Sequence, residues 1–161
     1  MLTRRPSERG RRLTLGQYLR FRLGPQGGTT AWFNFFIKPF GASPFAGFWR
    51  AWNPVYGYLL YYYSYRPLAR FLPRAAAMLV TFVVCGFVLH DLPAWALTMR
   101  VLPPGATIVF ILFGLGAALG EAFHMDLSRY PLLARAGINV VYLAGCSGAM
   151  LLIVQRVIRS H

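Results

Sequence analysis

A run of fifteen uncharged residues decides the fold: AAAMLVTFVVCGFVL, from Ala75 to Leu89. Two further apolar blocks follow along the chain, at residues 106–120 and 140–154. An α-helix needs about 20 mostly apolar residues to cross a bilayer, and each block extends to near that length. We therefore predict an all-α integral membrane protein with three transmembrane helices, the second at roughly 106–123 and the third at roughly 137–154.

The first apolar block ends in a polar pair, His90 and Asp91, followed by Pro93 and the apolar residues 94–99. Either the helix kinks at Pro93, or it ends at His90 and the remainder lies against the membrane interface. A polar residue at membrane depth is costly. One interpretation is an interfacial pair, because about 15 residues cover most of a ~30 Å hydrocarbon core. The other is a general base that lines a cavity, and the spacing leaves both open.

The distribution of charge indicates membrane topology. The chain of 161 residues is 57% hydrophobic and carries 17 Lys and Arg against 4 Asp and Glu. A net charge of +13 is compatible with nucleic acid, but the cations flank apolar blocks, so we expect a lipid bilayer and no nucleic acid as partner. If residues 31–65 do not cross, 14 cations lie on one side of the membrane and 3 on the other. The positive-inside tendency then predicts a multi-pass protein with a cytoplasmic N-terminus.

Charge and turn-forming residues divide the chain into three regions. Residues 1–30 are predicted to be a basic cytoplasmic tail and linker, because the first 22 carry seven arginines against one acid, Glu8. We expect this Arg-rich tail to rest on anionic lipid. Residues 31–74 are apolar and aromatic but interrupted by Lys, Pro and Gly, which favours an interfacial or re-entrant aromatic segment and leaves a bent span open. Residues 75–161 form the three-span membrane region.

A cluster of tyrosines supports the interfacial interpretation. Six tyrosines lie within ten positions, from Tyr56 to Tyr65, with Trp49 and Trp52 just upstream. Such rings collect at the level of the lipid headgroups, because one end is apolar and the other needs water. A stacking platform for bases is the alternative, which the adjoining apolar spans disfavour.

Residues 45–95 contain two ordered motifs. The first runs Phe48-Trp-Arg-Ala-Trp-Asn-Pro-Val-Tyr56 and is followed by Arg66-Pro-Leu68. The second is Thr81-Phe-Val-Val-Cys-Gly-Phe-Val-Leu-His90. Together they resemble the membrane-bound O-acyltransferase (MBOAT) family, and only its C-terminal half, which carries the catalytic motifs. The resemblance puts Asn53 at the family's Asn or His position and His90 at the family's histidine.

The resemblance implies transfer of an acyl group from coenzyme A or another thioester to a hydroxyl. His90 is then the general base that removes the acceptor proton. Asn53 orients a substrate or stabilises charge on the thioester carbonyl. Acyl-coenzyme A is a co-substrate in this scheme, and no bound cofactor is expected.

The small number of predicted spans favours a non-catalytic function, even for a chain that resembles the MBOAT family. Family members enclose their site with many more spans, whereas three spans would not enclose both an acyl chain and an acceptor. We therefore predict an accessory or packing subunit of a larger membrane complex; a degenerate acyltransferase is one form that such a subunit could take. The alternative is an active O-acyltransferase with His90 as base, so the sequence leaves enzymatic activity open.

Two short patterns bear on partners and metals. Small residues at Gly116-x-x-x-Gly120 and Ala144-x-x-x-Gly148 fit close helix contact, with other membrane subunits or by self-association. Glu121 and His124 form a Glu-x-x-His pair. A di-iron site needs two such pairs from facing helices, so no metal is expected.

Overall fold

The computed structural model describes residues 12–24, 29–43 and 45–160. Within these residues every regular element is a helix. Three helices are long and apolar enough to cross a membrane, and they extend over Arg74–Thr98, Gly105–Ala122 and Leu132–Arg159. The prediction of an all-α membrane protein with three spanning helices is confirmed.

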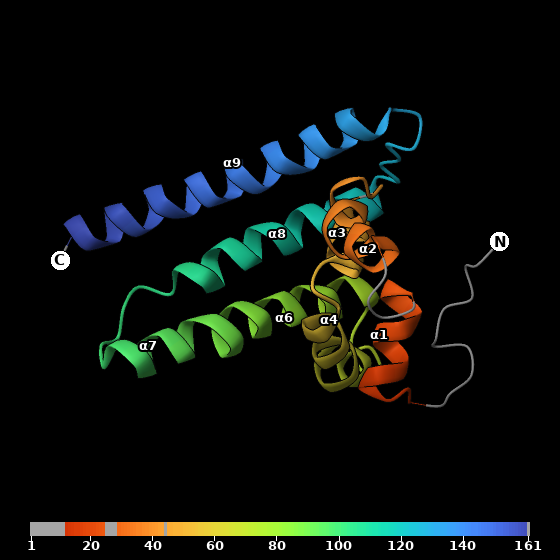
Figure 1. Cartoon of the computed structure of the whole chain (residues 1–161). Coiled ribbons are helices and arrows are strands. Elements are labelled where there is room, and N and C mark those ends of the chain that lie inside the picture. The colour runs from red at the N-terminus through yellow and green to blue at the C-terminus, as the bar shows by residue number, and fades with distance from the viewer. Residues whose placement is uncertain (1–11, 25–28, 44, 161) are drawn as a thin grey trace.

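The three long helices form the body of the molecule. The first consists of α6 (Arg74–Gly86), the π-helical segment η3 (Phe87–Asp91) and α7 (Leu92–Thr98). The second, α8 (Gly105–Ala122), runs back beside α6, and the third, α9 (Leu132–Arg159), returns to the end where α7 lies (Figure 1). Four short helices gather toward the opposite end (Figure 1): α1 (Leu15–Leu23), α2 (Thr29–Phe40), α3 (Phe45–Ala51) and α4 (Pro54–Leu60).

The first spanning helix continues through Pro93. Proline has no N–H to donate to the carbonyl four residues back, and η3 ends two residues before it. Just before the proline, the amide of Leu92 bonds to the carbonyl of Phe87, five residues back, which is the π-helical pattern. The same arrangement occurs before Pro67, where η2 (Tyr61–Tyr65) precedes α5 (Arg66–Leu68). The helix therefore does not end at His90, which was one of the two sequence interpretations.

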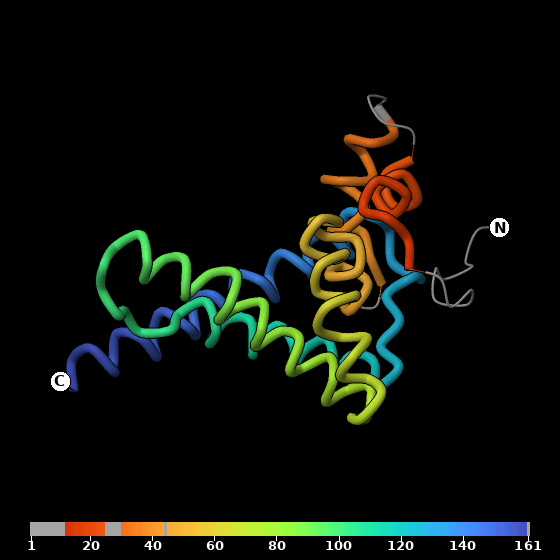
Figure 2. The backbone as a smooth tube through the Cα atoms, turned by 90° about the horizontal axis from the view of Figure 1, so that it is seen from below, coloured from red at the N-terminus to blue at the C-terminus, as the bar shows by residue number. Residues whose placement is uncertain are grey.

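Residues 31–74 pack against the sides of the spanning helices as well as at their ends. Helix α3 contributes Ala46 to a core with residues of α6 and α8: Phe82, Val109, Phe113 and Ala117. From α4 the chain leads through η2 back to the start of α6 (Figure 2). On this path the hydroxyl of Ser64 lies 3.3 Å from that of Thr81. The aromatic segment therefore contacts spanning helices along part of their length.

Part of the predicted basic tail is helical. Thr14 and Gln17 form a capping box at the start of α1, the arrangement that a Thr-x-x-Gln spacing favours. Tyr18 is buried against Tyr58 and Tyr62. The arginines at positions 4, 5, 9 and 11, four of the seven in the predicted lipid-binding tail, lie outside the described residues.

Candidate functional site

A hydrogen bond to the last turn of α6 orients the side chain of His90. Its Nδ1 lies 2.9 Å from the carbonyl oxygen of Cys85. A carbonyl can only accept, so Nδ1 is the donor, and in the neutral imidazole Nε2 is then the acceptor. The imidazole lies 4.9 Å from the ring of Phe110 and 6.0 Å from that of Tyr56, measured between centroids. His90 is half-buried and, within the described residues, no hydrogen bond engages Nε2.

Asp91 has a structural role. It is 5% exposed, and its carboxylate accepts hydrogen bonds from the amides of Ala106 and Thr107, at 3.1 and 2.8 Å. The hydroxyl of Thr107 donates a third, at 2.6 Å. These groups belong to the first turn of α8, where unpaired amides and the helix dipole favour a negative charge. Asp91 therefore ties the first spanning helix to the second.

Asn53 begins the helix that brings Tyr56 to His90. Its φ of 35° lies in the left-handed region, which Asn tolerates better than most residues. The side-chain oxygen accepts a hydrogen bond from the amide of Tyr56 at 3.3 Å, and Pro54 occupies the first helical position. The structure thus brings Asn53 and His90 to one region through the first turn of α4, although within the described residues no hydrogen bond joins them.

Trp49 lies inside the aromatic core. Its ring is 5.3 Å from Phe82, 5.7 Å from Phe110 and 4.9 Å from Phe113, between centroids. Its indole N–H is buried, and no partner for it occurs among the described residues. Trp52, in contrast, is exposed and stacks on Phe48 at 5.4 Å. The first tryptophan of the motif therefore packs against spanning helices.

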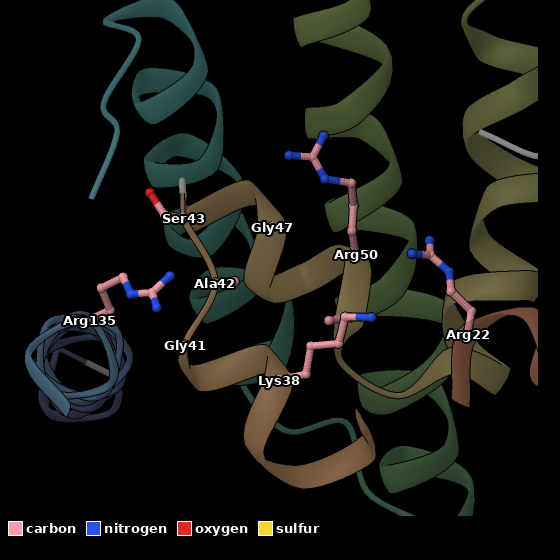
Figure 3. A pocket seen from close by; sticks show the side chains of 9 residues that line it. Arg22, Lys38, Gly41, Ala42, Ser43, Gly47, Arg50 and Arg135 are labelled. Atoms are coloured by element: carbon pink, nitrogen blue, oxygen red, sulfur yellow. The ribbon is translucent and has the colours of Figure 1, made fainter. Parts of the chain in front are cut away.

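A basic pocket is lined by residues of α1, α2, α3 and the start of α9 (Figure 3). The cavity has a volume of about 360 Å³, and nine residues line it: Arg22, Lys38, Gly41, Ala42, Ser43, Gly47, Arg50, Ala51 and Arg135. Its four cations stand on four different helices, far apart in the sequence. The sequence alone did not predict this site. The one local signal was Arg135, which lies just before the third span as the sequence predicts it.

Glu121, from the Glu-x-x-His pattern, lies near this pocket. One of its carboxylate oxygens is 3.2 Å from Nη1 of Arg50. His124 lies just beyond the end of α8, with a left-handed φ of 50°. Glu121 thus joins the end of α8 to α3.

The structure therefore offers an oriented histidine on the first spanning helix and a basic pocket at the end of the bundle. Comparison with known proteins assigns neither of them: no family model, curated protein or solved structure matches this chain.

Proposed function

We propose that this chain is a packing subunit of a membrane complex and binds another membrane protein, or a second copy of itself, through α9. The observation that carries the proposal is one open face of that helix. Four small residues of this face are exposed: Gly137, Ala144, Gly145 and Gly148. A Cβ added at any of the three glycines would meet nothing within 4 Å.

The spacing puts these residues on the side of α9 that faces away from the bundle. At 3.6 residues per turn, positions 137, 144, 145 and 148 share one face. Asn139 and Tyr142 lie on the other, and Asn139 is the one fully buried residue of this helix. Lipid tails are as apolar as leucine, so exposed apolar side chains on a spanning helix can face lipid and do not by themselves indicate a protein partner. Small residues do favour one, since they let two helix backbones approach closely.

Within the chain, α8 already uses a small residue to approach α9 closely. Gly116 of α8 lies against the phenol of Tyr142, and the Tyr142 hydroxyl donates a hydrogen bond to the Leu112 carbonyl at 2.7 Å. Any side chain at position 116 would occupy the place of that phenol. The face of α9 offers a second partner the same close approach.

Purification in mild detergent with light scattering tests the proposal. Wild-type protein is expected to run as a complex, and Ala144→Leu to release a monomer by blocking close backbone approach. Ala96→Leu is the matched control, because it adds the same volume at an exposed position of a different spanning helix. Wild-type protein that runs alone at monomer mass contradicts the proposal.

A second candidate is acyl transfer from a thioester to a hydroxyl. The hydrogen bond between His90 Nδ1 and the Cys85 carbonyl favours it, because Nε2 is then the acceptor that a general base needs. In this scheme Nε2 takes the hydroxyl proton as the acceptor oxygen bonds to the acyl carbon. The carbon–sulfur bond breaks, and the proton passes to the departing thiolate.

Acyl transfer in isolated membranes tests this candidate. Labelled acyl-coenzyme A is supplied, and transfer to lipid or sterol hydroxyls is measured. His90→Ala is expected to lower the rate by about 10²- to 10⁴-fold, the usual contribution of a general base. His124→Ala is the control and should leave the rate unchanged, so equal rates for the two variants exclude His90 as the base.

A further inference from the structure

We propose that the basic pocket binds a phosphate group, carried either by a lipid headgroup or by a soluble phosphate. Four cations line it: Arg22, Lys38, Arg50 and Arg135 (Figure 3). Its volume of about 360 Å³ falls in the range of small-molecule sites, about 300–1,000 Å³. The proposal depends neither on acyl transfer nor on association through α9.

The positive charge of the pocket is only partly neutralised within the chain. Glu121 pairs with Arg50, at 3.2 Å between nitrogen and oxygen. Asp126 accepts a hydrogen bond of 2.9 Å from the hydroxyl of Ser43, one of the lining residues. For Arg22, Lys38 and Arg135, in contrast, the part of the chain described here supplies no carboxylate within ion-pair distance. A site with this balance of charges attracts an anion.

The donors available in the pocket fit a phosphate. The Nε of Arg22 donates to the hydroxyl of Tyr18 at 3.1 Å, which leaves its two terminal nitrogens for a ligand. Arg135 extends from α9 toward Ala42 and Ser43 (Figure 3). Its Nε is buried and finds no partner among the residues described, and a buried donor without a partner is costly. Arginine forks match the oxygens of phosphate in bidentate geometry.

The position of the pocket along the spanning helices suits a headgroup. Arg135 is the fourth residue of α9, roughly 5 Å from its start at 1.5 Å per residue. Arg50 reaches Glu121 in the last turn of α8. The pocket therefore lies at the ends of two spanning helices, and basic pockets at that level bind anionic lipid headgroups. It also opens to soluble ligands.

Binding measurements on the delipidated whole chain test the proposal in two arms. Native mass spectrometry measures the affinity for phosphatidylglycerol, and calorimetry measures that for inorganic phosphate. The pocket variants are Arg135→Gln and Lys38→Gln. Arg156→Gln is the matched control, because Arg156 lies on the same helix as Arg135, near its other end, and is exposed. Each pocket variant is expected to bind about tenfold more weakly, as for loss of one charge-assisted hydrogen bond.

The two arms distinguish the sources of the phosphate. A loss of phosphatidylglycerol binding confined to the pocket variants supports a lipid headgroup, and the same pattern with inorganic phosphate supports a soluble ligand. Lys38 is exposed, so its replacement leaves the fold intact and provides the test if Arg135→Gln fails to fold. The proposal is overturned if, in both arms, the pocket variants bind as Arg156→Gln does.

Discussion

At the scale of single residues, Asp91 shows how a carboxylate is accommodated inside a spanning helix. Three hydrogen bonds from the first turn of α8 compensate its burial. The amides of Ala106 and Thr107 have no acceptor within their own helix, because they belong to its first turn. Asp91 therefore satisfies two amides that would otherwise be orphaned.

Replacing Asp91 tests this role. Asp91→Ala is expected to lower the free energy of unfolding by about 1–3 kcal/mol, since buried donors lose their acceptor. Asp91→Asn keeps one acceptor oxygen and should lose less. Unfolding in detergent, followed by tryptophan fluorescence during an SDS titration, provides the measurement. A wild-type midpoint for Asp91→Ala would contradict a capping role.

Asp126 gives a second residue-scale prediction, on pH dependence. Hydrogen bonds from the amide and hydroxyl of Ser128, both 2.8 Å, and from the hydroxyl of Ser43 lower the pKa of Asp126. Because the folded pKa lies below the unfolded value of about 3.9, this stabilisation is fully present above pH 4. It is lost as the pH falls through the folded pKa.

A carboxyl titration followed by NMR measures this shift. Ser128→Ala is expected to move the pKa of Asp126 up toward its ordinary value, because it removes the hydroxyl donor. Ser147→Ala is the control, since that hydroxyl bonds to the carbonyl of Leu143 within α9. Equal titration curves for Ser128→Ala and the wild type would show that the hydroxyl has no effect.

At the scale of secondary-structure elements, the close approach of α6 and α8 depends on Gly86. A Cβ at this position would lie 2.6 Å from Cα of Thr107 and 2.8 Å from the carbonyl oxygen of Ala106. Both are backbone atoms, so the clash cannot be relieved by a side-chain rotation. The same approach brings the Thr107 amide to Asp91, so packing and capping reinforce each other.

Gly86→Ala is expected to destabilise the protein by about 1–3 kcal/mol, the usual cost of overpacking. Gly120→Ala in α8 is the matched control, because a Cβ there meets nothing within 4 Å. Since alanine favours a helix over glycine by roughly 0.5–1 kcal/mol, the control should be neutral or slightly stabilised. SDS unfolding of both variants gives the comparison, and equal stability of the two would contradict a backbone clash at Gly86.

At the scale of the whole molecule, charge is divided between the two ends of the bundle. Arg100 follows α7, and Arg156 and Arg159 stand at the end of α9, the end of the molecule opposite to α1 and α2 (Figure 1). The short helices with their cations and the loop from α8 to α9 lie at the other end. By the positive-inside tendency, we expect that end to face the cytoplasm and the C-terminus to lie outside.

Labelling with a membrane-impermeant maleimide tests this orientation. Cys85 and Cys146 are first replaced by alanine, so that each variant has a single thiol. Ser160→Cys should react in intact cells, and Ser128→Cys, in the exposed loop before α9, should react only after permeabilisation. The reverse pattern would place the N-terminus outside.

The sequence by itself determined the features that depend on local composition. The spanning helices follow from length and hydropathy, which add up residue by residue along the chain. The start of α4 at Asn53 and Pro54 is also local, because capping and the fixed φ of proline act within one turn. The sequence singled out His90 from its place in an apolar block, but it could not give the orientation of the imidazole.

Tertiary structure alone decided which side chains meet. His90 and Asp91 are neighbours in the sequence, but their side chains bond to different helices. Asp91 bonds to a helix that begins 14 residues later, whereas His90 bonds to a carbonyl of its own helix. Tertiary structure also assembled the basic pocket from cations at positions 22, 38, 50 and 135. Hydropathy along a chain carries no information on which faces of distant helices pack together. That choice depends on close contacts such as Gly86 with Thr107, which form only when the helices are side by side.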